Sequence, residues 1–303
     1  MGYVKPVYKA VIPVAGLGTR MLPATKAIPK ELLPIYDRPL IEHVVKEAID
    51  GGITEIILVT RSGKEAIENH FDAHYELEHR LVKKGKDKIL EDIVKIIPDK
   101  VKISSIRQAD ALGLGHAILC AKHLVNDEPF AILLPDVLVL DKKVREKSYS
   151  FLQLANAWIN TGISQLMIEQ VDFASTENYG IINIGEKKIS LFETTPLKSL
   201  IEKPASKDAP SNLAVLGRYI LSPKIFDLLE NLTPGVGGEV QLTDALSKLL
   251  DLEGLNALKT DADIYDCGNK LGYLSANLAI GMRDPKSKAV IHALFDKLMD
   301  DDS

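Results

Sequence analysis

Glycines and cations alternate in a short loop that follows the first apolar run of the chain. Gly16 and Gly18 come directly after the run, and Arg20, Lys26 and Lys30 follow among prolines. Glycine lets the backbone approach a ligand closely and exposes amide donors to phosphate oxygens. The prolines stiffen the loop, which lowers the entropic cost of holding the cations in place. Converging cations beside exposed amides suit a polyphosphate, and the alternative is a turn whose basic residues face solvent.

The two commonest glycine-loop motifs do not account for this segment. A dinucleotide-binding fingerprint needs a third glycine at position 21, where the chain has Met21. The G-x-x-x-x-G-K-S/T pattern of a Walker A loop is also absent. Ligands bind outside the carboxyl ends of strands in open α/β sheets, so the position of the loop still makes it a candidate site.

An aspartate follows the apolar run 130–135 and is therefore expected at the carboxyl end of a buried strand. Asp136 is well placed there to hold Mg²⁺, a hard cation that prefers one or two carboxylates together with phosphate oxygens. Asp266 stands in a similar strand-to-turn setting before Gly268. The alternative for each aspartate is a role in a turn or at the end of a helix.

The elements that must position these residues begin with strands and helices in alternation. Short apolar runs with the length of buried strands lie at 7–15, 54–60, 101–106 and 130–134. Helical patterns between them lie at 39–51 and 115–124, and the capping-box spacing of Ser62 and Glu65 predicts a further helix that begins at Ser62. The charged stretch 75–95 is expected to be an amphipathic helix outside the sheet. Strand and helix in alternation predict a parallel sheet with right-handed crossovers.

The second half of the chain has a different texture. Its predicted strands are short and suggest antiparallel or mixed pairing, at 165–170, 180–184, 189–193 and 213–221. Its predicted helices lie at 144–158, 271–281 and 286–299. We therefore expect one α/β domain over residues 1–303, with a doubly wound, Rossmann-like mixed sheet and an α+β elaboration in the second half.

Composition excludes several classes of function. The 303 residues include 37 basic and 42 acidic side chains, a formal net charge of −5, and the lysines of 83–88 are diluted by acidic residues, so no general nucleic-acid binding is expected. Cys120 and Cys267 form neither a disulfide framework nor a C-x-x-C site, which favours a reducing compartment. No apolar stretch approaches the ~18 residues of a membrane helix, and no signal-peptide pattern is found. These features predict a cytoplasmic protein with no membrane partner.

Taken together, the motifs resemble those of sugar nucleotidyltransferases. Residues 15–34 are similar to the family signature G-x-G-T-R…P-x-T-K…P-K, and further shared motifs lie at 107–108, 112–117, 134–136, 178–180, 202–204, 217–219, 237–244 and 266–268. Over nearly the whole chain the longer resemblance is to the bacterial UTP–glucose-1-phosphate uridylyltransferases, or UDP-glucose pyrophosphorylases. It implies a nucleotide-binding part at 1–140 and a sugar-phosphate-binding and C-terminal helical part at 141–303.

On the nucleotide side, the resemblance implies contacts from Ala15, Gly16, Gly18, Thr19, Gln108 and Gly113. The backbone of Ala15 and Gly16 and the side chain of Gln108 would read the uracil edge. A carboxamide offers a donor and an acceptor, which matches an imide. Gly113 would lie beneath the base or ribose, where a side chain would clash. Without the resemblance, Gln108 would be interpreted as a surface residue after a strand.

The charged residues take roles by the same resemblance. Arg20 and Lys30 would contact the nucleotide phosphates, and Lys203 would bind the phosphate of glucose 1-phosphate; these three are the predicted catalytic residues. Asp136 and Asp266 would hold one Mg²⁺ between them. No role follows for Glu31 or for residues 239–244, although both match the family.

The sugar-phosphate site implied by the resemblance contains Gly180, Glu202, Lys203 and Val215. Glu202 would accept hydrogen bonds from sugar hydroxyls. Neighbouring strand residues normally point to opposite faces, which would keep Glu202 and Lys203 from sharing a ligand. Pro204 indicates a strand end or bend, where side chains need not alternate between faces. Taken alone, these residues would be interpreted as an exposed strand end.

The implied reaction makes UDP-glucose and pyrophosphate from UTP and glucose 1-phosphate, assisted by Mg²⁺. One alternative is a thymidylyltransferase or another nucleotide-sugar pyrophosphorylase, because a pocket discriminates one methyl group by only ~1–3 kcal/mol. Another is a non-catalytic nucleotide- or sugar-sensing protein of the same fold. The family also implies a homodimer or homotetramer.

Overall fold

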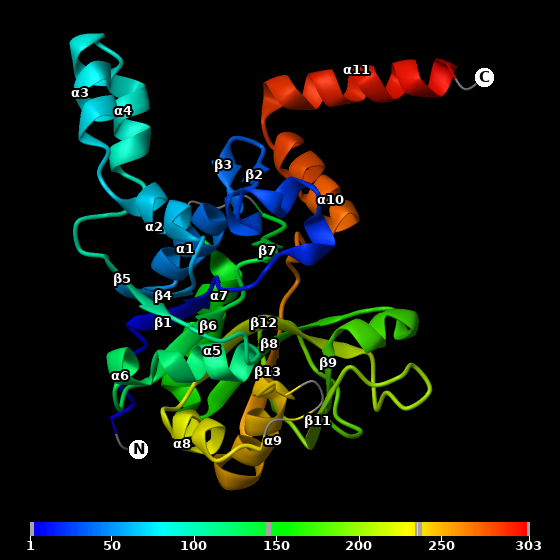
Figure 1. Ribbon diagram of the computed structural model, residues 1–303. Coiled ribbons are helices and arrows are strands. Elements are labelled where there is room, and N and C mark those ends of the chain that lie inside the picture. Colours follow the sequence, from blue (N-terminus) through cyan, green and yellow to red (C-terminus); the bar gives the residue numbers. More distant parts are fainter. Residues whose placement is uncertain (1–2, 144–146, 234, 236–237, 302–303) are drawn as a thin grey trace.

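The computed structural model describes residues 3–143, 147–233, 235 and 238–301. A mixed sheet forms its centre (Figure 1). The first half contributes parallel strands: β1 (Lys9–Pro13), β4 (Glu55–Thr60), β5 (Lys102–Arg107) and β6 (Phe130–Leu133). β1 lies between β4 and β6, and β5 pairs with β4. Because these strands are parallel, the loops that follow β1 and β6 leave the sheet at the same edge.

The second half extends the same sheet. Its strands are β8 (Ser164–Gln170), β9 (Gly180–Asn183), β10 (Thr194–Pro196), β11 (Ser199–Glu202), β12 (Leu213–Leu221) and β13 (Leu255–Lys259). β12 joins the halves, since it is antiparallel to β6 on one side and to β8 on the other. The main path runs β10-β13-β8-β12-β6-β1-β4-β5, with β9 and β11 beside it. The expected α/β class with a mixed sheet is confirmed.

Helices cover both faces of the sheet. One face packs against α1 (Leu40–Asp50), α2 (Glu65–Phe71) and α7 (Tyr149–Thr161), and the other against α5 (Leu114–Cys120), α8 (Lys224–Glu230) and α9 (Leu242–Glu253). Strand alternation supplies the two cores: Ala131 and Leu133 of β6 face α1, whereas Phe130 and Ile132 face α5 and α8. All four side chains are fully buried.

Small ribbons and helical turns sit at the edge of the sheet where the glycine loop emerges. The ribbons pair β2 (Pro34–Ile35) with β3 (Arg38–Pro39), and β7 (Val137–Leu140) with β14 (Asp263–Asp266). The 3-10 turns are η1 (Thr19–Met21), η2 (Ala24–Lys26), η3 (Lys30–Leu32) and η4 (Phe173–Asn178). In the β7–β14 ribbon Asp266 is directly opposite Val137, so it lies one residue from Asp136 across the ribbon.

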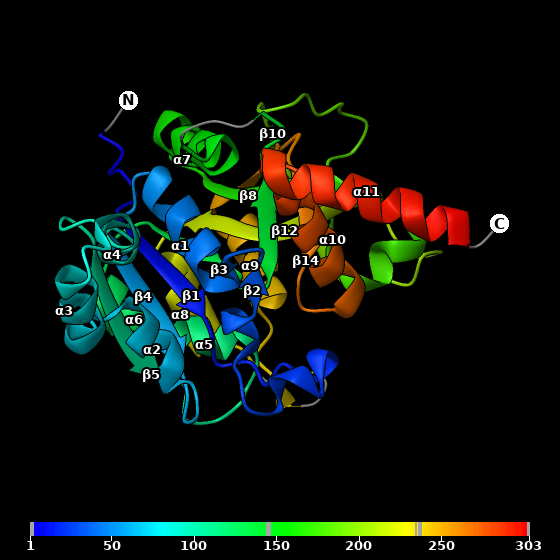
Figure 2. The same cartoon turned by 90° about the horizontal axis from the view of Figure 1, so that it is seen from above.

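Two arms project from opposite sides of the molecule (Figures 1 and 2). One is the hairpin of α3 (Tyr75–Lys83) and α4 (Asp87–Val94). The other is α11 (Pro285–Asp301), which follows α10 (Lys270–Gly281). Among the described residues, no helix is both long enough and apolar enough to cross a membrane.

The helix predicted to begin at Ser62 begins instead at Glu65, so the capping-box prediction is wrong. Gly63 takes a left-handed turn with φ +84°, and its N–H donates to the Glu65 carboxylate. Lys64 occupies the N-cap position, while its ammonium donates to buried Glu31 at 2.6 Å. The buried Glu31 carboxylate needs a cationic partner, and Lys64 supplies it from the N-cap position. The helix accordingly begins later than predicted.

Other predicted elements differ in their boundaries. The helix expected at 115–124 is split at Ala121 into α5 and α6 (Lys122–Val125). The stretch 75–95 forms two helices because Gly85 turns the chain with φ +59°. The helix expected from 144 begins at Tyr149, whose backbone N–H donates to Asp141 Oδ2 at 2.6 Å, and residues 144–146 lie outside the described residues. The stretch 189–193 forms only a single bridge, from Leu191 to Lys259.

Candidate active site

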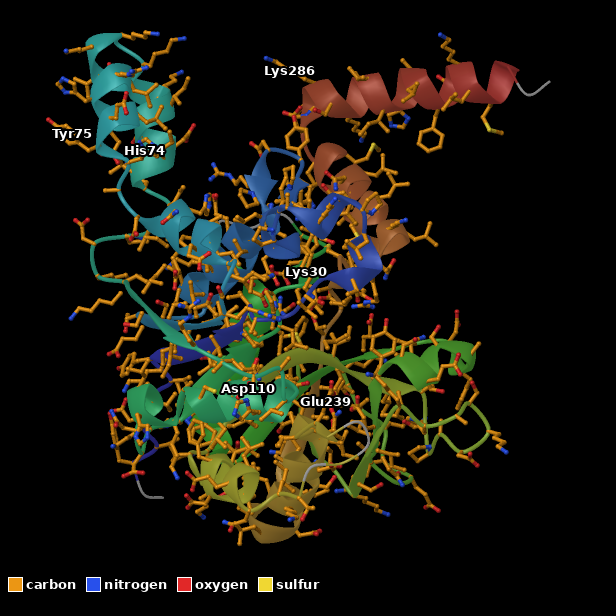
Figure 3. All side chains as sticks on the ribbon, viewed as in Figure 1. Lys30, His74, Tyr75, Asp110, Glu239 and Lys286 are labelled. Atoms are coloured by element: carbon orange, nitrogen blue, oxygen red, sulfur yellow. The ribbon has the colours of Figure 1, made fainter. Side chains whose placement is uncertain are left out.

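Two cavities lie next to each other at the edge of the sheet where β1 and β6 end. The smaller has a volume of about 400 Å³ and the larger about 910 Å³. They share part of their walls: Leu114, Leu134, Asp136 and Glu239 line both. Figure 3 shows Lys30 near the middle of the view, with Glu239 below it. A ligand at the shared wall can therefore touch residues of both cavities.

Every residue to which the resemblance assigns a site role lines one of these cavities. The smaller is lined by Ala15, Gly16, Gly18, Thr19, Lys30, Gln108, Gly113 and Asp136. The larger is lined by Arg20, Asp136, Gly180, Glu202, Lys203, Val215 and Asp266. Lys26, the third cation of the loop, is exposed and lines neither cavity. Positions spread over most of the chain thus converge on one place.

The glycine loop closes over the side chain of Lys30. A Cβ added to Gly16 would lie 3.8 Å from Lys30 Cε, and one added to Gly18 would lie 3.3 Å from Lys30 Cβ. Gly18 also has φ +69°, a conformation that side chains rarely adopt, and its carbonyl accepts a hydrogen bond from Thr25 Oγ1 at 2.8 Å. The loop therefore needs glycine at position 18, and Lys30 reaches the smaller cavity beneath it.

Cations and carboxylates pair directly where the cavities meet. Lys30 Nζ is 2.6 Å from Asp136 Oδ2, and Arg20 Nη1 is 3.0 Å from Asp266 Oδ2. Arg20 Nη2 also lies 3.6 Å from Asp136. Burial would raise the pKa of Asp136, but the charge and hydrogen bond of Lys30, with the charge of Arg20, hold that pKa below its ordinary value. Asp136 is therefore available as an anionic ligand near neutral pH.

The two aspartates also meet the requirements of a magnesium site. A Cβ added to Gly268 would lie 2.8 Å from Asp136 Oδ2 and 2.9 Å from Asp266 Oδ1, so both carboxylates border the small space beside this glycine, as does the Arg20 guanidinium that pairs with them. The N–H of Cys267 donates to the Asp136 carbonyl at 2.8 Å, which ties the two segments together. Two carboxylates beside a cavity large enough for phosphate groups are the donor set that Mg²⁺ prefers.

The inner end of the smaller cavity is a turn with a buried amide. Gln108 is only 7% exposed, and its Nε2 donates to the Gly113 carbonyl at 3.1 Å and lies 3.0 Å from His116 Nδ1. Gly113 has φ +93°, and an added Cβ would clash with Glu239 Cβ at 2.9 Å. The interpretation of Gln108 as a surface residue is therefore wrong, and Gly113 is fixed both by its conformation and by a close neighbour.

In the larger cavity, a strained residue lets two neighbouring side chains share one space. Lys203 has φ +44°, directly after β11 ends at Glu202. This left-handed conformation interrupts strand alternation, so Glu202 and Lys203 both line the cavity. Lys203 Nζ is 3.5 Å from Glu202 Oε1, and its backbone N–H donates to the Tyr179 carbonyl at 3.0 Å. The bend expected near Pro204 thus falls on Lys203 itself.

Two polar residues of this cavity had no role in the sequence-based site. Thr243, in the first turn of α9, donates from Oγ1 to Glu202 Oε2 at 2.6 Å and so orients that carboxylate. Glu169 near the end of β8 lines the cavity, and burial raises its pKa to about 7. The resemblance drew attention to the stretch containing Thr243, whereas no local pattern marks Glu169.

Glu31 has a structural partner that the sequence did not reveal. Its side chain is fully buried and accepts from Lys64 Nζ at 2.6 Å. Burial raises its pKa, although the charges of Lys64 and Lys30 act in the opposite direction. Because Glu31 follows Lys30 directly, this pair anchors the end of the glycine loop to the start of α2.

Known proteins resemble the chain in both sequence and structure. The family Nucleotidyl transferase matches residues 9–282. The UTP–glucose-1-phosphate uridylyltransferase of Haemophilus influenzae is 48% identical over 278 residues, which cover 92% of this chain and 94% of that protein. A solved UTP-bound UGPase from Acinetobacter baumannii is 44% identical, covers 96% of this chain and 99% of its own, and has a TM-score of 0.88. A solved UDP-glucose pyrophosphorylase complexed with UDP-glucose is 37% identical, with coverage of 92% and 100% and a TM-score of 0.81.

Proposed function

The chain belongs to the nucleotidyl transferase family, and from that premise we propose that it transfers the uridylyl group of UTP to glucose 1-phosphate. The products are UDP-glucose and pyrophosphate. The observation that carries the proposal is the cluster of Arg20, Lys30, Asp136 and Asp266 at the junction of two cavities. A relative named for this activity is 48% identical to the chain over 92% of its length.

The smaller cavity suits UTP. Gln108 and the backbone of Ala15 and Gly16 face the uracil edge, and Gly113 leaves room for the base or ribose. Lys30, together with Arg20 from the adjoining larger cavity, contacts the phosphates and stabilises the leaving pyrophosphate. Planar guanidinium and compact ammonium groups both bind phosphate oxygens. Substrate binding therefore replaces the internal partners of these cations with phosphate groups.

The larger cavity suits glucose 1-phosphate. Lys203 binds its phosphate, and Glu202 accepts hydrogen bonds from sugar hydroxyls while Thr243 holds the second carboxylate oxygen. Gly180 and Val215 line the remaining wall through small or apolar surfaces. The sugar phosphate is thereby placed with its phosphate toward the shared wall, where Asp136 lies.

The reaction is an in-line displacement. An oxygen of glucose 1-phosphate attacks the α-phosphorus of UTP, the bond to the β-phosphate oxygen breaks, and pyrophosphate leaves. The nucleophile is already an anion, so the chain needs no general base, and no covalent intermediate with the protein forms. Positioning and charge neutralisation by Arg20, Lys30 and Lys203 lower the barrier. Mg²⁺ held by Asp136 and Asp266 would neutralise part of the phosphate charge.

We also propose a homodimer or homotetramer that works in the cytoplasm. α11 exposes a stripe of apolar side chains, with Val290 at 68%, Leu294 at 54% and Leu298 at 54% exposure, as expected for a surface that another subunit covers. Light scattering during gel filtration tests the assembly. Cys120 and Cys267 are free thiols, which is consistent with a reducing compartment.

A pyrophosphate-release assay tests the activity. Each of UTP, dTTP, CTP and ATP is combined with glucose 1-phosphate and galactose 1-phosphate in the presence of Mg²⁺. We expect the highest kcat/KM for UTP with glucose 1-phosphate. Preference for dTTP would identify a thymidylyltransferase, and binding of UTP without turnover of any pair would indicate a sensing protein; either outcome contradicts the proposal.

A further inference from the structure

Arg218 in β12 is a fully buried cation whose charge lies outside both cavities. Its side chain is 0% exposed, and it forms a bidentate ion pair with Glu47 of α1. Arg218 Nε donates to Glu47 Oε1 at 2.9 Å, and Nη2 donates to Oε2 at 2.8 Å. Burying a charge is costly unless it is paired and hydrogen-bonded, so an ion pair in this position needs a reason.

The remaining N–H groups of Arg218 bind the turn that carries Asp136. Nη1 donates to the Leu134 carbonyl at 3.0 Å, and Nη2 donates to the Val137 carbonyl at 2.6 Å. These two carbonyls lie on either side of Pro135 and Asp136. One rigid guanidinium therefore holds both ends of the turn, while the Asp136 carboxylate points to Lys30 and the cavities.

An irregularity in β12 brings Arg218 under this turn. The pairing of β12 with β8 shifts between Val215 and Tyr219, and Gly217 within the shift has φ +69°. The Leu134 N–H donates to the Gly217 carbonyl at 2.9 Å, and a Cβ at position 217 would lie 2.7 Å from Leu134 Cγ. Bulges commonly re-aim side chains beside active sites. Here the bulge turns Arg218 toward the Asp136 turn.

We propose that Arg218 and Glu47 are a positioning pair that fixes the Asp136 carboxylate for the divalent cation. The pair touches neither substrate and acts only through the 134–137 turn. Guanidinium geometry is required, because a lysine ammonium cannot pair with both carboxylate oxygens and both carbonyls at once. The inference rests on the proposed metal site and extends it to residues that no cavity-lining argument would select.

A matched control exists at the other end of β1. Lys9 is 7% exposed, donates to the carbonyls of Leu124 and Val125 at 3.1 Å each, and pairs with Glu128. It is thus a buried cation that binds two carbonyls and a carboxylate, but it lines neither cavity. A variant of Lys9 reports the effect of losing such contacts on stability alone.

The experiment compares the full-length wild type with Arg218→Lys, Glu47→Gln and Lys9→Met. Mn²⁺ replaces Mg²⁺ because it is paramagnetic. Its binding is measured by electron paramagnetic resonance with and without UTP. Melting temperatures and the KM and kcat values are measured alongside. We expect both pair variants to weaken Mn²⁺ binding at least tenfold and to lower kcat, with the KM for glucose 1-phosphate changed less than twofold. Lys9→Met should lower only the melting temperature.

The outcomes separate this inference from the proposed function. A wild type that binds no Mn²⁺ overturns the metal site and this inference with it. A wild type that binds Mn²⁺, with pair variants whose Mn²⁺ binding and kcat match Lys9→Met, overturns the positioning pair alone. If Arg218→Lys fails to fold, Glu47→Gln decides, because it preserves the size of the side chain and one acceptor for Arg218.

Discussion

The charged side chains of the two cavities differ in burial and in pairing. In the smaller cavity, Lys30 and Asp136 are largely buried, with side-chain exposures of 14% and 16%, and they pair at 2.6 Å. In the larger cavity, the Lys203 side chain is 60% exposed and lies 3.5 Å from its nearest described partner, Glu202. The smaller cavity thus holds a buried internal pair, Lys30 with Asp136, whereas the larger cavity offers the Lys203 cation to solvent.

This difference predicts how each cavity would bind the phosphate of its proposed substrate. If UTP occupies the smaller cavity as proposed, its phosphates displace the carboxylate that already pairs with Lys30, so the free energy of binding depends on what then neutralises that carboxylate. If glucose 1-phosphate occupies the larger cavity as proposed, its phosphate meets the exposed Lys203 cation on a strained backbone, and few contacts have to be displaced. We therefore expect substitutions on the nucleotide side to affect turnover most and those on the sugar side to affect substrate affinity.

Asp136→Asn should have the largest effect, because it removes a proposed metal ligand and the partner of Lys30. We expect kcat to fall at least about 100-fold in steady-state assays with Mg²⁺. The freed cations should at the same time bind metal-free UTP more tightly, which isothermal titration calorimetry measures. Near-normal turnover would contradict the proposed metal site, and unchanged metal-free UTP affinity would contradict the view that the Lys30–Asp136 pair competes with phosphate.

Lys203→Ala should come next, and its effect should fall on one substrate. Losing a charged hydrogen bond costs about 1.5–3 kcal/mol, so the KM for glucose 1-phosphate should rise about 10- to 100-fold. The KM for UTP should change little, since Lys203 lines only the larger cavity. Initial rates over a grid of both substrates check this. A larger change for UTP would mean that the two subsites are exchanged.

Gln108→Ala should have a smaller effect, limited to the choice of base. The side chain contributes hydrogen bonds and no charge, so the kcat/KM ratio of UTP over CTP should fall about 5- to 10-fold. Triphosphate binding, measured with inorganic tripolyphosphate as competitor, should stay the same. Unaltered nucleotide preference would remove Gln108 from the base-reading role.

Glu169→Gln should have the smallest effect. It tests a carboxyl whose pKa is shifted upward, whereas the pKa of Asp136 is shifted downward. The unfolded chain releases the Glu169 proton near pH 4.5, whereas the folded protein holds it until about pH 7. The folded state binds more protons in that window, so the free energy of unfolding falls as pH rises through it. Asp136 acts in the opposite sense: its lowered pKa stabilises the fold at neutral pH, and that stability is lost only in acid.

Urea denaturation at pH 5 and pH 8 measures this difference. After allowance for partial exposure, Glu169→Gln should be about 1 kcal/mol more stable than the wild type at pH 8 and nearly equal to it at pH 5. Glu177 lines the same cavity but is exposed, so Glu177→Gln is the control. Equal stability of Glu169→Gln and wild type at pH 8 would show that solvent screens this carboxyl.

The sequence predicted best what depends on local pattern. The β1 strand, the glycine loop after it and Asp136 at the end of β6 are all defined by short runs, and the parallel sheet that brings them together follows from strand and helix alternation. The position of Lys203 was also predicted, but its left-handed backbone was not, because no periodicity announces a positive φ at a lysine.

Contacts between residues that are distant in the sequence were not predicted. Arg218 meets Glu47 across 171 positions, and Glu202 meets Thr243 across 41. Such pairs are set by the stacking of elements, which a single sequence does not encode in any short motif. Ser62 illustrates the reverse error: its spacing matched a capping box, yet the fold used Lys64 at that helix end to satisfy buried Glu31.

The β7–β14 ribbon has a consequence for how this chain tolerates insertions and deletions. Side chains alternate along a strand, so adding or deleting one residue between Val137 and Leu140, or between Asp263 and Tyr265, would turn Asp266 away from Asp136. The ribbon has only four residue pairs, so a change of register that restored the position of Asp266 would have to alter all four pairs. Length changes in natural or engineered variants should therefore accumulate in the projecting hairpin 75–94 and along α11, and should be absent from these two short strands.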